Sequence, residues 1–498
     1  MNPNQQTSED LATIEQDDSL PLSEKIAYGV GDTACNLFWK LFENFQLFFY
    51  TDVFGISAAS AGTMFLVTKI WDAFNDPLIG MLADRTRTTW GSFRPYLIWM
   101  AIPFAIIGAL TFYTPDLPDR QKLVYAYVTY TMVFMAYTSV NIPYAALLGV
   151  LTRTPLERTS VSSIRMLFAY LGGVAVQLCT NPLVKHFGGV KEIETVDGIE
   201  SVVANPQTGF FWTAVCYASI AACLLLITAF STQERIRVER PKSSSLLSDL
   251  TDLWSNRPWI ILLFVGQLQI LAGWIRGSAT AYYFIYVSDF QASYKFNLRA
   301  FEIVLDFSDF GLFLAMGTAS AMASVFLAKP LVRLIGNKRL MIAVLFLNAL
   351  TLLSFVLVRP DQWLAIYVLR CLGGFVSGPT AILLWTMVAD AIDYSEWLNH
   401  RRATGLVFAT TGFFCKLGGA MGSAIPGWLL AVGGFLAPMN GVAQPQPEKA
   451  IQFITYMMSV IPAAVIFIAC FLMCFYGLNK ETLAQVEKEL ASRRDRQA

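Results

Sequence analysis

The chain has 498 residues, of which 55% are hydrophobic and only 14% are charged. Soluble domains usually carry about 25% charged residues, so most of this surface is expected to avoid water. Lys plus Arg equals Asp plus Glu at 36 each, and this balance gives no basic field for nucleic acid. The eight cysteines stand in apolar runs without a CxxC pair, which is typical of buried small residues.

The N-terminal segment 1–25 is polar and acidic, and it is predicted to be a disordered cytoplasmic tail. It lacks the basic start and apolar core of a secretory signal. About 20 apolar residues in a helix span hydrocarbon. Twelve runs of this kind follow, near 26–51, 58–83, 96–114, 123–149, 161–184, 209–231, 258–288, 309–335, 340–358, 362–389, 403–435 and 451–477.

A polar stretch rich in Arg, Glu and Ser separates the sixth run from the seventh. It predicts a cytoplasmic central loop at 232–257 between two six-helix bundles, 26–231 and 258–478, with a cytoplasmic tail at 479–498. The predicted fold is therefore an all-α membrane protein with twelve transmembrane helices, arranged as two bundles around a cavity. Lys and Arg are more frequent in the loops on the side of the central loop, so that side and both termini are predicted to be cytoplasmic.

The second run contains two acids at a depth where charge is costly. Asp72 and Asp76 are four residues apart and therefore share one helix face, with Asn75 beside them. Pro77 frees a backbone carbonyl one turn earlier. Two carboxylates and neutral oxygens suit a hard cation, while two close like charges favour a proton on one of them. The alternative is that each acid simply pairs with a base such as Lys69 or Lys416.

Lys416 lies deep in the eleventh run, next to glycines that allow close helix packing. An ammonium group there needs an anionic partner, and Asp72 or Asp76 is the natural choice. The alternative is that the Lys416 side chain extends to the membrane interface.

A polar stripe follows the first run, because Asp32, Asn36, Trp39 and Glu43 recur at helical spacing. Such a stripe on a spanning helix is expected to line an aqueous cavity. Amide, guanidinium and aromatic groups together suit a hydroxylated ligand. The alternative for each residue is hydrogen bonding between helices. The candidate substrate-binding residues are Asn36, Trp39, Tyr137, Asn141, Arg165, Arg276 and Thr411.

Acids alternate with arginines after the second and tenth runs, as expected of a cytoplasmic gate. A solvated, positive-inside loop would explain the arginines equally well. The candidate gate residues are Asp84, Arg85, Arg94, Asp390, Asp393 and Arg402.

These features resemble the glycoside–pentoside–hexuronide:cation symporter family of the major facilitator superfamily. The matching stretches are Tyr28–Asp32, Phe49–Val53, Trp71–Pro77 with Gly80, Asp84–Thr86, Arg94–Pro95 and Val388–Tyr394 with Glu396, followed by Lys416. The resemblance implies that Asp72, Asn75, Asp76 and Thr138 form the cation site of the melibiose permeases. It also implies that Lys416 neutralises this site and that Arg165 binds sugar.

The sequence departs from that family at the expected sugar site. Asn36 and Asn141 replace two carboxylates, and Ala145 and Ala381 replace two aromatic rings. Neutral amides with Arg165 and Arg276 would tolerate a carboxylate on the substrate. A uronide or other acidic glycoside is therefore a hypothesis.

The sequence thus predicts a monomeric symporter of the inner membrane that carries a sugar or glycoside with Na⁺ or H⁺. No cofactor and no enzymatic activity are expected. Asp72 and Asp76 would be the metal ligands if Na⁺ is the coupling ion. The alternatives are a lysolipid:cation symporter of the same superfamily, a membrane-embedded enzyme and a passive channel. No HExxH, GxSxG or phosphate-binding loop supports the enzyme.

Overall fold

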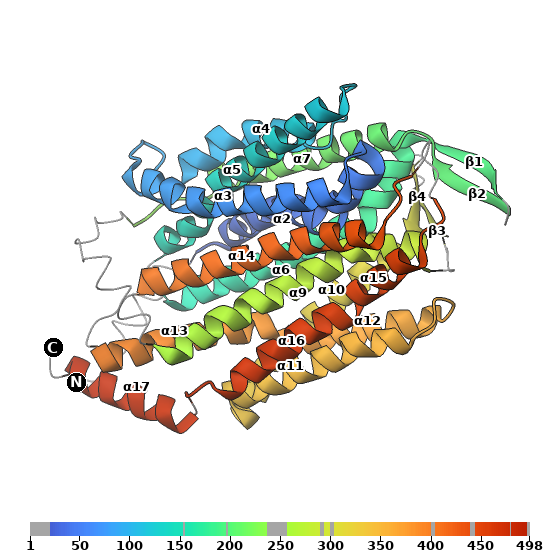
Figure 1. Ribbon diagram of the computed structural model, residues 1–498. Coiled ribbons are helices and arrows are strands. Elements are labelled where there is room, and N and C mark those ends of the chain that lie inside the picture. Colours follow the sequence, from blue (N-terminus) through green and yellow to red (C-terminus); the bar gives the residue numbers. More distant parts are fainter. Residues whose placement is uncertain are drawn as a thin grey trace. The chain divides into compact units, whose positions relative to one another are not determined.

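Helices make up most of the computed structural model (Figure 1). It describes residues 20–152, 155–195, 198–236, 256–288, 293–298, 303–399, 404–438, 444–478 and 480–495. The first half contains α2 (Leu22–Phe48), the π-helical turn η1 (Phe49–Phe54), α3 (Ala58–Arg85), α4 (Arg94–Leu110), α5 (Asp119–Leu151), α6 (Pro155–Gly188) and α7 (Pro206–Ser231). The second half contains α9 (Arg257–Tyr286), α10 (Asp309–Ile335), α11 (Asn337–Ser354), the 3-10 turn η2 (Phe355–Leu357), α12 (Trp363–Ser377), α13 (Pro379–Asn399), α14 (Thr404–Gly433), α15 (Glu448–Met458), α16 (Val460–Cys474) and α17 (Lys480–Asp495).

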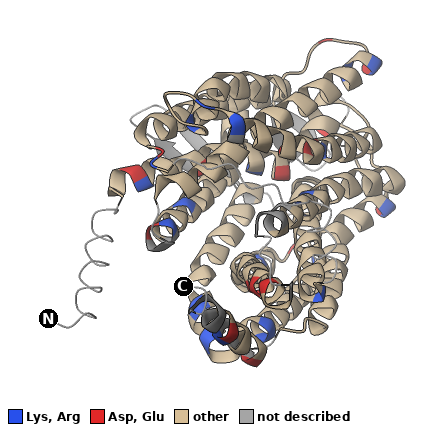
Figure 2. Ribbon diagram, turned by 90° about the vertical axis from the view of Figure 1, so that its left-hand side faces the viewer, with Lys and Arg blue, Asp and Glu red and all other residues tan. Residues whose placement is uncertain are grey.

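A helix, or a consecutive pair of helices, overlaps each predicted span within the described residues. Eight helical segments there are long and apolar enough to cross a membrane. They correspond to α5, α6, α7, α9, α10, α11, the α12–α13 pair and the α15–α16 pair. The helices α2 and α3 fall outside this set, and they carry the polar stripe and the paired acids. Charged side chains are sparse along most of the helical ribbon (Figure 2).

Two short β-sheets, which were not predicted from the sequence, accompany the helices of this otherwise all-α fold. The strands β1 (Val190–Thr195) and β2 (Gly198–Val203) pair antiparallel, with Val190 opposite Val203. The strands β3 (Ser293–Leu298) and β4 (Ile303–Ser308) form a second two-stranded sheet. The first sheet lies between α6 and α7 and the second between α9 and α10, in loops on the side opposite the one predicted to be cytoplasmic.

Side-chain caps set where two of the long helices begin. Asn205 accepts a hydrogen bond from the Thr208 backbone N–H at 3.0 Å, and α7 then starts at Pro206. Asn256 accepts from the Trp259 N–H at 3.1 Å at the start of α9. A cap of this kind satisfies a backbone donor that the first helical turn leaves unpaired.

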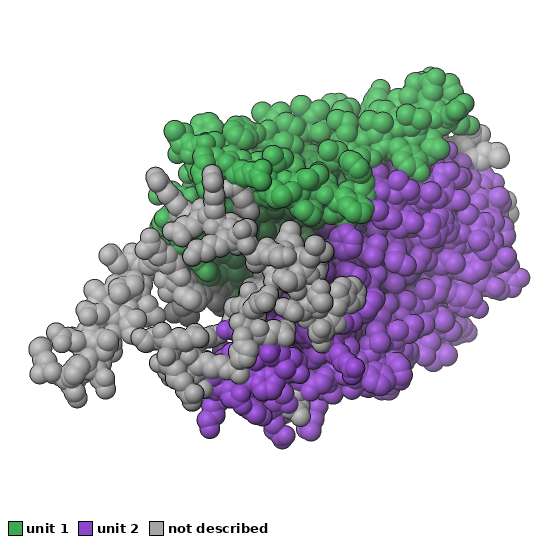
Figure 3. Space-filling model, turned by 60° about the vertical axis from the view of Figure 1, so that its left-hand side comes forward, with its two compact units in different colours: residues 1–42, 71–241, 297–305 green, residues 43–70, 242–296, 306–498 purple. Residues whose placement is uncertain are grey.

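The chain forms two compact units, coloured separately in Figure 3. Unit 1 is Met1–Phe42, Trp71–Pro241 and Asn297–Leu305, and unit 2 is Glu43–Ile70, Lys242–Phe296 and Asp306–Ala498. The division runs through α2 and α3. It therefore differs from the predicted boundaries of 26–231 and 258–478, because the segment 43–70 belongs to unit 2.

Close glycine contacts explain why the first half of α3 packs in unit 2. A Cβ on Gly62 would lie 2.6 Å from the Ala424 carbonyl oxygen, and one on Gly427 would lie 2.4 Å from the Ala58 carbonyl oxygen. Only glycine permits this approach of α3 to α14. In the rest of unit 2, α9 packs on α14 and α16, and α10 packs on α12.

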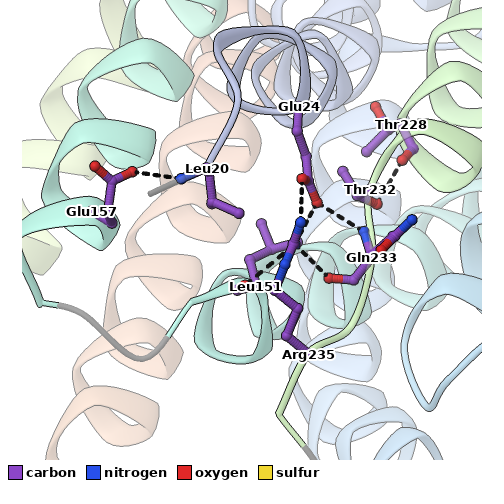
Figure 4. A network of polar contacts seen from close by, with 8 residues as sticks. All are labelled: Leu20, Glu24, Leu151, Glu157, Thr228, Thr232, Gln233 and Arg235. Atoms are coloured by element: carbon purple, nitrogen blue, oxygen red, sulfur yellow. Dashed lines mark hydrogen bonds and ion pairs between the residues drawn. The ribbon is translucent and has the colours of Figure 1, made fainter. Parts of the chain in front are cut away.

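The residues that follow α7 tie several helix ends of unit 1 together (Figure 4). Arg235 donates two hydrogen bonds of 2.7 Å to the carboxylate of Glu24 at the start of α2. Its backbone N–H donates to the Val150 carbonyl at the end of α5. We call the contact of Glu24 with Arg235 the Glu24–Arg235 clasp. It lies at the beginning of the predicted central loop.

Glu234, which directly precedes Arg235, caps the start of α4. Its carboxylate accepts hydrogen bonds of 2.8, 2.8 and 2.9 Å from the backbone N–H groups of Ser92, Phe93 and Arg94. Negative charge at a helix N-terminus is favourable because of the helix dipole. This cap therefore joins the end of α7 to the start of α4.

Candidate cation and substrate sites

The two acids of α3 meet at one hydroxyl group of α5. The Thr138 Oγ1 atom lies 2.7 Å from Asp72 Oδ1 and 3.1 Å from Asp76 Oδ1. Asp72 is 4% exposed and Thr138 is 1% exposed, whereas Asp76 is half-buried. The helix α3 continues through Pro77, so the four-residue spacing holds both carboxyl groups toward α5.

Asn75 completes the polar surface at this point. It is buried, and its Nδ2 atom has no hydrogen-bond partner among the residues that the structure describes. An unsatisfied buried N–H donor is costly, so it indicates a group with an acceptor atom that shares the site in another state, while the Asn75 Oδ1 atom stays available to a cation. Two carboxylates, a hydroxyl and an amide are all oxygen ligands, the kind that hard cations prefer. No cluster of three His, Cys, Asp or Glu side chains able to hold a metal occurs in the described ranges.

The two candidate bases belong to unit 2. Lys69 is buried, and its ammonium group lies over the Trp274 ring and donates to the Gly419 carbonyl at 3.4 Å. Lys416 is half-buried on α14. The pairing of Lys416 with Asp72 or Asp76 stays a prediction.

The Arg165 guanidinium has a partner that the sequence did not identify. Its Nε atom donates to Asp32 Oδ2 at 3.0 Å, and its Cζ atom lies 5.1 Å from the Tyr144 ring centroid. Tyr144 stacks on Tyr28 with ring centroids 4.7 Å apart, and each hydroxyl donates to the other residue's carbonyl. Asp32 stood in the predicted polar stripe, but its partner lies 133 residues further along the chain.

Four of the predicted substrate residues lie in unit 1 on α2 and α5. The Trp39 and Tyr137 rings stack with centroids 5.7 Å apart. Asn36 is half-buried and donates to the Asp32 carbonyl of its own helix, and Asn141 is half-buried one turn beyond Tyr137. These aromatic and amide groups could present a ring face and polar atoms to a sugar.

The other two, Arg276 and Thr411, lie in unit 2 and are buried. The Arg276 guanidinium lies 5.3 Å from the Phe355 ring and 5.9 Å from the Phe313 ring. Its Nε atom has no hydrogen-bond partner within the described part of the chain. Thr411 accepts a hydrogen bond from Trp259 Nε1 at 3.1 Å. A substrate role for either residue stays a prediction.

The predicted gate residues have varied surroundings. Arg94 donates to the Ala229 carbonyl at 2.7 Å, and Asp390 accepts from Asn337 at 3.1 Å. Arg85 is exposed at the end of α3, and Asp393 is half-buried on α13. Arg402 and the side chain of Asp84 lie outside the described residues. The gate therefore stays a prediction.

The helical fold, with its apolar spans and a buried acidic site, is that of a multi-pass membrane protein. The sequence profile described as "MFS/sugar transport protein" matches residues 27–480. The chain belongs to this family, which confirms the resemblance found in the sequence.

Curated relatives match the chain over nearly its whole length. A protein of Escherichia coli (strain K12) provisionally named a glycoside/cation symporter is 36% identical over 472 residues, covering 94% of both chains. An isoprimeverose transporter of Lactiplantibacillus pentosus is 34% identical over 489 residues, covering 96% of this chain and 94% of that protein. An "inner membrane symporter" of E. coli (strain K12) is 34% identical over 473 residues, covering 95% of each.

Solved structures share the fold at low sequence identity. A D-xylose–proton symporter has a TM-score of 0.57 at 11% identity, with 92% of this chain and 97% of that chain covered. A bacterial homologue of the lysosomal transporter Spinster, in an inward-facing and occupied conformation, has a TM-score of 0.60 at 13% identity, with 91% and 95% covered.

Proposed function

We propose that this protein is a secondary active transporter that carries a sugar or glycoside across the inner membrane together with a monovalent cation. The names of its relatives support the sugar and the symport. The one observation that carries the cation site is the Thr138 hydroxyl, which lies within hydrogen-bond distance of both Asp72 and Asp76. The coupling ion is Na⁺ or H⁺, held by these residues and Asn75.

The paired acids supply the coupling. With both acids ionised, an incoming cation or the Lys416 ammonium group offsets one of their two negative charges. A cation at Asp72 and Asp76 frees Lys416 and favours substrate binding at the Trp39–Tyr137 surface. Lys416 pairs with the emptied acids after release, so that the carrier can return. Twelve spans with both termini cytoplasmic give the two bundles needed for alternating access.

The membrane potential sets how much accumulation such coupling can drive. A potential of about 100 mV is worth about 2.3 kcal/mol per charge that moves inward. Since about 1.4 kcal/mol corresponds to a tenfold ratio, one cation drives about 50-fold accumulation.

Uptake into proteoliposomes with an imposed Na⁺ or H⁺ gradient tests this function. Labelled glycosides are offered to the wild type, to Asp76→Asn and to Asp361→Asn, whose side chain is 61% exposed and far from α3 in sequence. We expect gradient-driven accumulation in the wild type and Asp361→Asn, and none in Asp76→Asn, which keeps some exchange. Equal accumulation in all three would remove Asp76 from the mechanism.

The acidic-glycoside hypothesis depends on Arg165 and Arg276, and Arg165 is the one of the two whose guanidinium group forms an ion pair in the described part of the chain. Because Arg165 is already paired with Asp32, a substrate carboxylate would have to displace Asp32 or share the guanidinium with it. A neutral glycoside needs only to accept a hydrogen bond from the same group. We therefore place neutral glycosides first among the substrates and keep the acidic ones as the second candidate.

A further inference from the structure

One acid of the family motif Phe49–Val53 has no part in the symport mechanism. Asp52 lies on η1, beyond the end of α2 at Phe48 and one residue past the predicted first span. The turn ends at Gly55, whose φ of +88° is the left-handed conformation that glycine adopts readily. In the proposed orientation, Asp52 lies at the outer end of α2.

The carboxyl group of Asp52 is held by two hydroxyl groups. Tyr286 Oη of α9 donates to Asp52 Oδ1 at 2.5 Å, and Thr51 Oγ1 donates to Asp52 Oδ2 at 2.5 Å. Thr51 Oγ1 also lies 2.7 Å from Tyr282 Oη. The Phe435 ring covers Tyr282 and Tyr286 edge-on, at centroid distances of 5.4 and 5.2 Å.

No basic side chain contacts Asp52 in the described part of the chain. The titratable groups that face it are Tyr282 and Tyr286 of α9, both neutral phenols, and the other covering group, Phe435, is apolar. Asp52 is half-buried, and partial burial without a counter-charge still favours the neutral form of a carboxyl group. Burial raises the pKa of Asp52 to about 7, although the hydrogen bonds from Thr51 and Tyr286 act in the opposite direction.

The hydrogen-bond network can satisfy either form of the acid. When Asp52 is ionised, Thr51 and Tyr286 both donate to it. When a proton from water neutralises Asp52, the acid becomes a donor, and Thr51 Oγ1 can accept. The Thr51 hydrogen then turns to the Leu47 carbonyl, whose oxygen already lies 3.1 Å away. Neither form leaves a buried polar atom of this group unpaired, as a reversible proton site requires.

We propose that Asp52 is a proton-binding site, separate from the cation site, and that its protonation holds η1 against α9. The idea that η1 separates from α9 depends on the proposed function, because alternating access requires the helices to move. The binding of a proton to Asp52 does not depend on it. If η1 left α9, Asp52 would be exposed to water and its pKa would return to that of an ordinary carboxyl group. Protonation of Asp52 therefore favours the contact between η1 and α9. The contact is therefore most stable at acid pH and weakens as the pH rises through about 7.

Infrared difference spectroscopy of the purified full-length protein tests the site without any substrate. We expect a protonated-carboxyl band that titrates near pH 7 in the wild type and Asp361→Asn and is lost in Asp52→Asn. Tyr286→Phe removes a donor to the carboxylate, so its midpoint should move upward. A band that titrates unchanged in Asp52→Asn, or none in the wild type, would overturn the proposal.

Hydrogen exchange of the segment 47–56 tests the contact. After correction for intrinsic rates, we expect stronger protection at about pH 6 than at about pH 8, one unit on either side of the midpoint. Asp52→Asn, which stays neutral, should be protected equally at both values. The proposal fails if the variant keeps the pH dependence of the wild type. A protein that failed in sugar uptake could still pass both tests, so the two proposals fail separately.

Discussion

The ammonium nitrogen of Lys69 lies 3.4 Å from the centroid of the Trp274 indole ring, within unit 2. Lys69 precedes Asp72 by one helical turn on α3. The negative face of the ring stabilises the buried ammonium, in addition to the Gly419 carbonyl that accepts its hydrogen bond. The helix α3 therefore carries the carboxyl group of Asp72 and, one turn earlier, the ammonium group of Lys69, which Trp274 of α9 covers.

A double-mutant cycle measures this contact. Lys69→Met keeps the apolar stem, Trp274→Leu removes the ring face, and the double variant completes the cycle. We expect an interaction energy of about 0.5–2 kcal/mol from unfolding in detergent, because the pair is desolvated. If the changes in unfolding free energy of the two single variants add up to that of the double variant within about 0.3–0.5 kcal/mol, the ring face does not stabilise the ammonium group.

The second prediction concerns the hydroxyl group between the two acids. Thr138→Ala should change cation binding about 10-fold or more, because a hydrogen bond to a charged group contributes about 1.5–3 kcal/mol. Loss of the donor to the two acids should strengthen the binding of H⁺, whereas loss of the ligand oxygen should weaken the binding of Na⁺. Thr138→Ser keeps the hydroxyl and should stay near the wild type. The measurement is the cation concentration that gives half-maximal uptake. The same value in Thr138→Ala and the wild type would exclude Thr138 from the site.

The convergence of Asp72 and Asp76 could be predicted because their spacing is local. Asp72, Asn75 and Asp76 lie within five residues, and a helix of any packing presents the two acids on one face. The partners of Arg165 and Arg235 could not be predicted in this way. Asp32 and Glu24 lie 133 and 211 residues away, and no local periodicity shows which acid a buried arginine will meet.

The two β-sheets were missed for a different reason. In the segment from Val190 to Val203 the apolar residues recur at every third position and not at every second one, as a half-buried strand would require. Its Asp197-Gly198 dipeptide is a turn signal, but Gly198 is already paired with Thr195 in the sheet. The sequence therefore carries a turn signal in this loop but no alternation that predicts the two strands.

The third prediction follows from the pairing of Asp32 with Arg165. Asp32→Asn keeps the size of the side chain but removes the negative charge from the guanidinium, which is then available to a substrate carboxylate. We expect a glucuronide to compete for uptake about 10-fold better in this variant, since a charge-assisted bond contributes about 1.5–3 kcal/mol. The matching neutral glucoside, tested in parallel, should change little. Equal changes for both glycosides would place Arg165 outside the substrate site.

The last prediction concerns the Glu24–Arg235 clasp (Figure 4). Glu24 is 6% exposed and accepts three hydrogen bonds, two from Arg235 and one from the Gln233 backbone N–H. Glu24→Gln removes the charge and should lower the free energy of unfolding by about 1.5–3 kcal/mol. The lower part of this range is expected, because the Arg235 side chain is 34% exposed and water can solvate it.

The matched control for the clasp is the ion pair of Arg359 with Asp361, whose side chains are 74% and 61% exposed and 3.7 Å apart. Exposed pairs contribute about 0.2–1 kcal/mol, so Asp361→Asn should shift thermal unfolding only slightly. If Glu24→Gln shifts it no more than this control, the clasp does not stabilise unit 1. A larger shift, together with unchanged cation dependence of uptake, would show that Glu24 acts by joining helix ends, because its carboxylate accepts hydrogen bonds from Gln233 and Arg235 and not from the candidate cation-site residues in the described part of the chain.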